Sequence, residues 1–138
     1  MPAADVNYLA VLVAALATFA LGALWYSPAV LGKQWMHAHS YTPEKVAAMR
    51  QGATRAYAVS FACYLVMAFV LSLLVDYTGA TTAAQGLWLG FLAWLGFAAT
   101  IGLTANMFSD KPIATYLIDA GYQLAYLLVM GVILAVWR

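Results

Sequence analysis

Four long runs of apolar residues dominate the chain, and polar residues gather between them. An α-helix needs about 20 apolar residues to cross roughly 30 Å of hydrocarbon, and each run meets that length. No run alternates apolar with polar residues, so the pattern favours helices over the strands of a membrane barrel. We therefore predict an all-α integral membrane protein, an antiparallel four-helix transmembrane bundle with spans at about residues 7–26, 56–75, 86–107 and 113–137.

The sizeable polar region of the chain covers about residues 27–55, between the first two spans. Within it, Leu31 and Trp35 fall on one helical face while Lys33 points elsewhere. A short helix with one apolar face is typical of a segment that lies flat on a membrane surface. The pattern predicts a cytoplasmic interfacial helical segment between helices 1 and 2.

A second helix start lies later in the same region. Thr42, Pro43 and Glu44 place an N-cap hydroxyl, a proline and an acid in the order that begins a helix. Gly52 weakens a join between this helix and the second span without forbidding it.

Composition supports a lipid environment. Hydrophobic residues make up 66% of the chain and charged residues 8%, whereas a soluble domain is about 25% charged. The net charge of +1 provides no basic field for a nucleic acid. We expect one domain, residues 1–138, whose main partner is the lipid bilayer.

The distribution of basic residues predicts the orientation. Short loops that are rich in lysine and arginine stay on the cytoplasmic side of a membrane. The segment between the second and third spans, residues 76–85, contains neither, and Arg138 at the C-terminus opposes the trend. Both termini are therefore expected outside, since the other basic residues lie between spans 1 and 2 or 3 and 4: Lys33, Lys45, Arg50, Arg55 and Lys111.

Small residues recur along the faces of three spans. In lipid, helices associate through close packing, and small residues let their backbones approach. The pattern predicts tight helix contacts, within the subunit or between the subunits of a homo-oligomer. The third span carries Gly86, Gly90, Ala93, Phe97, Thr100 and Thr104, the first carries Gly22, and the fourth carries Gly121 with Ala125.

Asp119 is the one ionisable residue well inside a span, about 10 Å from the start of the fourth helix. An acid there costs about 2.5–3.5 kcal/mol, so it needs a polar partner, and Arg55 and Asn106 are the candidates at similar depth. Its helix face is either the lining of a pore, pocket or proton relay, or a hydrogen-bond network that fixes helix packing. Within an arc of about 120°, that polar face holds Thr115, Tyr116, Asp119, Tyr122, Gln123 and Tyr126.

The sequence contains no pattern typical of a metal site, a disulfide or a catalytic nucleophile. His37 and His39 are two residues apart, which on a helix places their rings on different faces, and Glu44 is the nearest acid. We therefore expect no metal site and no cofactor. The single cysteine, Cys63, excludes an intrachain disulfide, and no serine lies in a nucleophile elbow, so we expect no enzyme.

Three stretches together resemble a known family. They are LGALWYSP at residues 21–28 followed by GKQWM at 32–36, WLGFAAT at 94–100, and IDAGYQL at 118–124 followed by VMG at 129–131. In this order they resemble the domain-of-unknown-function family numbered 1761, small bacterial membrane proteins of four predicted spans. The resemblance implies a bacterial cytoplasmic (inner) membrane location and brings no activity.

Two classes of function fit these observations. The first is a transporter or channel for a small solute or ion, built as a homo-oligomer because four helices alone enclose little room. The second is a non-transporting membrane subunit that binds a partner protein or lipid.

Overall fold

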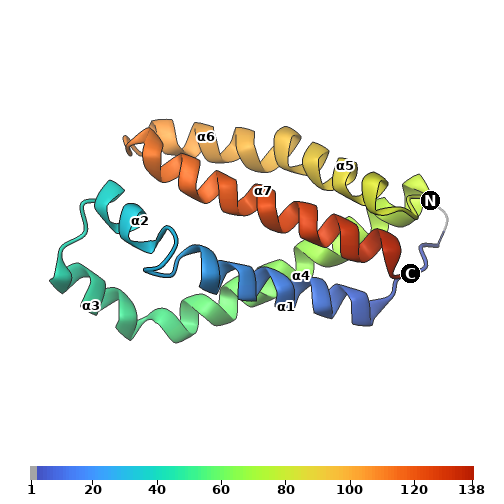
Figure 1. Cartoon of the computed structure of the whole chain (residues 1–138), viewed down its shortest axis with the longest axis horizontal. Helices are drawn as coiled ribbons and strands as arrows, with labels where there is room; N and C mark the ends of the chain where they lie inside the picture. The colour runs from blue at the N-terminus through green and yellow to red at the C-terminus, as the bar shows by residue number, and fades with distance from the viewer. Residues whose placement is uncertain (1–2) are drawn as a thin grey trace.

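The structure, a computed structural model, describes residues 3–138. Every regular element in that part of the chain is helical (Figure 1). Four helices are long and apolar enough to cross a membrane, which confirms the four apolar spans predicted from the sequence. These four are α1 (Tyr8–Trp25), α4 (Ala53–Thr78), the continuous run of α5 (Ala83–Ala93), η1 (Trp94–Ala98) and α6 (Ala99–Phe108), and α7 (Ile113–Val136).

Two short helices, α2 (Gly32–Ala38) and α3 (Pro43–Gln51), fill the polar region between α1 and α4. The predicted start of α3 is confirmed, because the Thr42 hydroxyl accepts a hydrogen bond from the backbone N–H of Lys45 at 3.2 Å. Gly52 separates α3 from α4, so the helices do not join. Figure 1 places both short helices at the end of the molecule that lies away from the chain termini.

Helix α7 is the centre of the bundle and packs against α1, α2, α4 and α5 (Figure 1). The half of α7 nearer the C-terminus carries the core, with Leu127, Met130 and Leu134 all buried. Apolar burial is worth about 25 cal/mol per Å² against water, but a lipid tail is as apolar as these side chains. Shape complementarity and interhelical hydrogen bonds must therefore hold α7 in place in a membrane.

Glycine supplies that complementarity where α5 crosses α7. A Cβ atom added to Gly86 would lie 2.2 Å from the carbonyl oxygen of Gly131, and one added to Gly131 would lie 2.1 Å from that of Gly86. A Cβ at Gly90 would lie 2.3 Å from the carbonyl oxygen of Leu127. The predicted contact at Gly86 and Gly90 is thus formed within one chain, between backbones.

The predicted stripe does not continue along the whole third span. At η1 the N–H of Ala99 bonds the carbonyl of Trp94, five residues earlier, which makes one π-helical turn. The extra residue in that turn rotates the rest of the helix by about 100°. As a result Phe97, Thr100 and Thr104 are exposed, so this part of the predicted stripe forms no contact within the chain. Ala99 and Asn106 are the buried residues of α6 instead.

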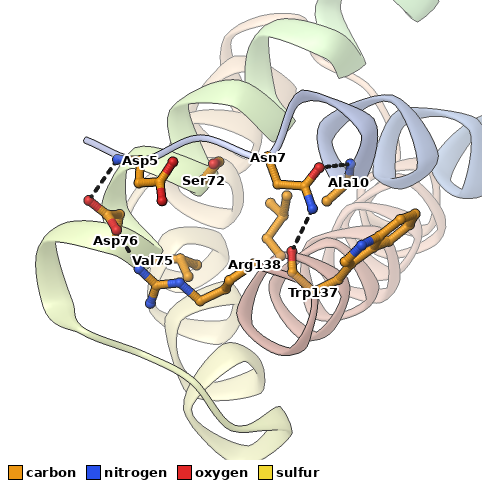
Figure 2. A pocket seen from close by; sticks show the side chains of 9 residues that line it. Asp5, Asn7, Ala10, Ser72, Val75, Asp76, Trp137 and Arg138 are labelled. Carbon is orange, nitrogen blue, oxygen red and sulfur yellow. Dashed lines mark hydrogen bonds and ion pairs between the residues drawn. The ribbon is translucent and has the colours of Figure 1, made fainter. Parts of the chain in front are cut away.

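The two ends of the chain are joined by polar contacts (Figure 2), at the end of the bundle away from α2 and α3. Arg138 forms an ion pair with Asp76, and the N–H of Asp5 donates to the same carboxylate at 3.2 Å. Asn7 donates to the carbonyl of Trp137 at 3.5 Å. The space among these side chains is about 10 Å³, which holds one water at most. The group therefore joins α1, α4 and α7 and neutralises the charge of Arg138.

Gly90→Ala tests the backbone contact between α5 and α7. Alanine is the better helix former by up to about 1 kcal/mol, yet a Cβ at this position meets the Leu127 carbonyl. We expect a net loss of about 1–3 kcal/mol, measured as a lower thermal unfolding midpoint in one detergent. Gly96→Ala is the control, because nothing lies within 4 Å of its Cβ position. A Gly90→Ala protein as stable as Gly96→Ala would contradict the contact.

Candidate functional site

Asp119 on α7 accepts two hydrogen bonds on the same carboxylate oxygen. The Tyr26 hydroxyl donates to Oδ1 at 2.5 Å, and the indole N–H of Trp35 donates to it at 3.0 Å. Tyr26 is the first residue after α1, and Trp35 lies in α2. One carboxylate oxygen thus joins three helices.

The partners that the sequence suggested for Asp119 are wrong. Arg55 is exposed near the start of α4, and the one ion pair among residues 3–138 is that of Arg138 with Asp76. The Asn106 amide instead donates to the carbonyl of Lys111 at 3.1 Å and accepts from the Thr115 hydroxyl at 3.1 Å. Similar depth in the bundle did not identify the partners, because a tight turn after α1 brings nearer donors.

That turn depends on a glycine. The N–H of Gly32 bonds the carbonyl of Ser27 at 2.9 Å, so α2 begins directly after the chain reverses. A Cβ at position 32 would lie 2.3 Å from the carbonyl oxygen of Tyr26. Trp35 is one turn into α2 and therefore returns to Asp119. The indole of Trp35 points at α7, and the predicted interfacial position of this segment stays a prediction.

Two further indoles bond the backbone of α7 on either side of Asp119. Trp25 donates to the carbonyl of Ile118 at 3.1 Å, and Trp94 donates to that of Ala120 at 2.9 Å. The predicted packing glycines make room for the rings of this region. A Cβ at Gly121 would lie 3.1 Å from the Trp25 ring, and one at Gly22 would lie 2.6 Å from the Tyr122 hydroxyl. Ala93 and Ala125 are only partly buried.

A polar cleft of about 170 Å³ opens beside Asp119, between α6 and α7. It brings together four of the six residues of the predicted polar face, and it adds His39, from the segment after α2. Its polar side chains are His39, Asn106, Ser109, Lys111, Thr115, Tyr116, Asp119 and Gln123.

Asp119 and His39 each have a polar atom without a partner among residues 3–138. Both hydrogen bonds to Asp119 fall on Oδ1, so Oδ2 receives none. The Nε2 atom of His39 is buried and unbonded. A buried polar atom without a partner costs about 1–3 kcal/mol, so a bound ligand or water that satisfied it would be stabilised.

The His39 ring is held between aromatic side chains and is uncharged at neutral pH. Its centroid lies 4.4 Å from that of Trp35 and 4.8 Å from that of Tyr41. Burial lowers the pKa of the His39 imidazole below its usual value; Asp119 opposes this effect and Lys111 adds to it. Neutral His39 therefore adds no positive charge to the cleft.

The other two residues of the predicted face, Tyr122 and Tyr126, do not line the cleft. The Tyr122 hydroxyl donates to the carbonyl of Thr18 at 2.8 Å and lies 3.2 Å from the hydroxyl of Tyr64 on α4. Tyr126 contacts the sulfur of Met67 at 3.6 Å. The face thus divides into residues that line the cleft and residues that bond or contact neighbouring helices.

Three residues beside Asp119 were not predicted as part of a site: Tyr26, Trp35 and His39. The one sequence signal that could have indicated them is the density of rings in residues 25–41.

The fold and this site define a helical protein with four helices long and apolar enough to cross a membrane, and with a polar cleft at one end. The chain belongs to the family described as "Protein of unknown function (DUF1761)", whose model matches residues 9–135. The resemblance drawn from the sequence is thereby confirmed. No curated protein and no solved structure matches the chain.

Substitutions at Asp119 test its two hydrogen bonds. Asp119→Leu leaves the donors of Tyr26 and Trp35 unpaired, which should cost about 1–3 kcal/mol for each and lower the unfolding midpoint in detergent. Asp119→Asn keeps an accepting oxygen and should unfold close to wild type.

Tyr26→Phe should lose about 1–3 kcal/mol, because it removes one of the two donors. Tyr57→Phe, on an exposed residue, is its control. Equal midpoints for Asp119→Leu and Asp119→Asn would show that the network does not stabilise the bundle.

Proposed function

We propose that this protein binds a small polar solute in the Asp119 cleft and passes it across a bacterial cytoplasmic membrane. In this proposal the chain is an antiparallel four-helix membrane bundle. The role is binding and translocation, without catalysis and without a cofactor.

The observation that carries the proposal is the half-satisfied carboxylate of Asp119. Ionisable residues within membrane spans are costly, and they mark solute or proton pathways more often than packing sites. A purely structural acid would use both oxygens inside the protein. Here Oδ1 is bonded, Oδ2 receives no bond from residues 3–138, and Asp119 lines an open cleft.

Charge distribution supports a cytoplasmic position for the cleft. Lys111 lies at its rim, and α2 and α3 lie at the same end of the bundle (Figure 1). Basic residues concentrate on the cytoplasmic side of membrane proteins. At the other end of the bundle, near the chain termini, the charge of Asp76 is paired with that of Arg138. Both termini are therefore outside in this proposal.

The half of the bundle where Gly86 meets Gly131, called the closed half here, supports assembly into a homo-oligomer, because it contains no path for a solute. Leu127, Met130 and Leu134 are buried, and Gly86 contacts Gly131 through the backbone. A solute that enters the cleft thus meets packed residues in the closed half. Passage needs a path between subunits or a rearrangement of the helices. The exposed Gly96, with open space at its Cβ position, offers a place for another helix to approach.

The same closed half favours a second candidate, a membrane subunit that binds its solute without transporting it. The two candidates share the cleft and differ in flux. A binding protein would respond to solute in the cleft and leave membrane permeability unchanged.

Osmotic re-swelling of proteoliposomes tests the proposal. Vesicles are shrunk with glycine, methylammonium chloride, sodium acetate or urea, and light scattering follows solute entry. We expect faster re-swelling than in protein-free vesicles for at least one solute, with a rate about tenfold lower for Asp119→Asn. That variant retains the accepting oxygen for Tyr26 and Trp35. Rates equal to protein-free vesicles for all four solutes would refute transport by the single protein.

A further inference from the structure

Two opposite charges line the cleft without pairing. Asp119 stands on α7, and Lys111 lies in the turn that follows α6. The one ion pair among residues 3–138 lies at the other end of the bundle, so the Lys111 ammonium and the Asp119 carboxylate are more than 4.0 Å apart. Both charges nevertheless act on the His39 ring, which lines the same cleft. The two charges therefore lie near the same ring without contacting each other.

The cleft volume sets the size of what can fill that space. A water molecule takes about 30 Å³ of liquid, so a cleft of about 170 Å³ has room for several waters or a solute of similar bulk. Nucleotides are much larger. The cleft therefore matches a small solute.

Uncharged hydrogen-bonding groups lie on the same walls. The Gln123 amide and the Ser109 hydroxyl form no side-chain hydrogen bond with residues 3–138, and His39 Nε2 is buried without a partner. The Gln123 amide, the Ser109 hydroxyl and the free Oδ2 of Asp119 are therefore available to a ligand. Together they offer both donors and acceptors, as a ligand with both kinds of group requires.

We propose that the solute of this cleft is a small zwitterion, a molecule that carries an ammonium and a carboxylate one or two carbons apart. Its ammonium bonds the free oxygen of Asp119, and its carboxylate faces Lys111. An anion alone would leave Asp119 unpaired, and a cation alone would leave Lys111 without its partner. This inference rests on the proposed function, because it uses the same cleft.

Binding of radiolabelled glycine to the protein in lipid nanodiscs tests the inference, with methylammonium and acetate as competitors. Each competitor carries one of the two charges. We expect glycine to bind, and each competitor to need a concentration at least about tenfold higher than unlabelled glycine. Asp119→Asn and Lys111→Gln should each weaken glycine binding about tenfold or more. Lys33→Gln, away from the cleft, should leave binding unchanged.

Methylammonium provides the sharper comparison, since Lys111→Gln should weaken the binding of glycine and leave the binding of methylammonium unchanged. Competition by methylammonium that equals that of glycine, or full glycine affinity in Lys111→Gln, would overturn the zwitterion. In those cases the cleft still binds a solute, so the proposed function survives. Absence of glycine binding refutes the inference, and the proposed function then depends on the re-swelling of vesicles with the other solutes.

Discussion

The structure depends on an acid placed inside an apolar helix. A carboxylate in α7 is costly in lipid unless donors reach it. The turn after α1 and the return of α2 bring two donors, Tyr26 and Trp35, to one oxygen of Asp119. Because those donors come from different elements, the requirement of a single side chain also positions the polar segment between α1 and α4.

The same arrangement explains why the bundle has two different ends. Where Gly86 meets Gly131 the helices are in backbone contact and no room is left for a solute. Towards α2 the π-helical turn redirects α6, so that Gly102 and Asn106 line a cleft. π-Turns often occur at functional sites, since they change which side chains a helix presents. Here the turn divides the helix between a packing half and a half that faces the cleft.

The sequence predicted what depends on local composition. The length of the apolar runs identified the four long helices, and the 100° spacing of a helix placed Thr115, Tyr116, Asp119 and Gln123 on one face. The spacing could not show that Tyr122 points away from the cleft. A rotation of a few tens of degrees about the helix axis decides whether a ring points to the cleft or to α4. The π-helical turn was not visible either, since the apolar pattern continues through residues 94–98 without a break. The partners of Asp119 come from a turn whose path no periodic pattern describes.

Water access to the cleft provides the most direct measurement. Cys63 is exposed and is first replaced by alanine, and a single cysteine is then placed at Gln123, on the cleft wall. In vesicles, a water-soluble thiol reagent should modify Gln123→Cys from the side on which the cleft opens, because a thiolate forms where water enters. Val129→Cys, at an exposed apolar position of the same helix, should stay unmodified in lipid. Modification of Gln123→Cys alone is the result expected of an open polar cleft, and a Gln123→Cys as inert as Val129→Cys would contradict it.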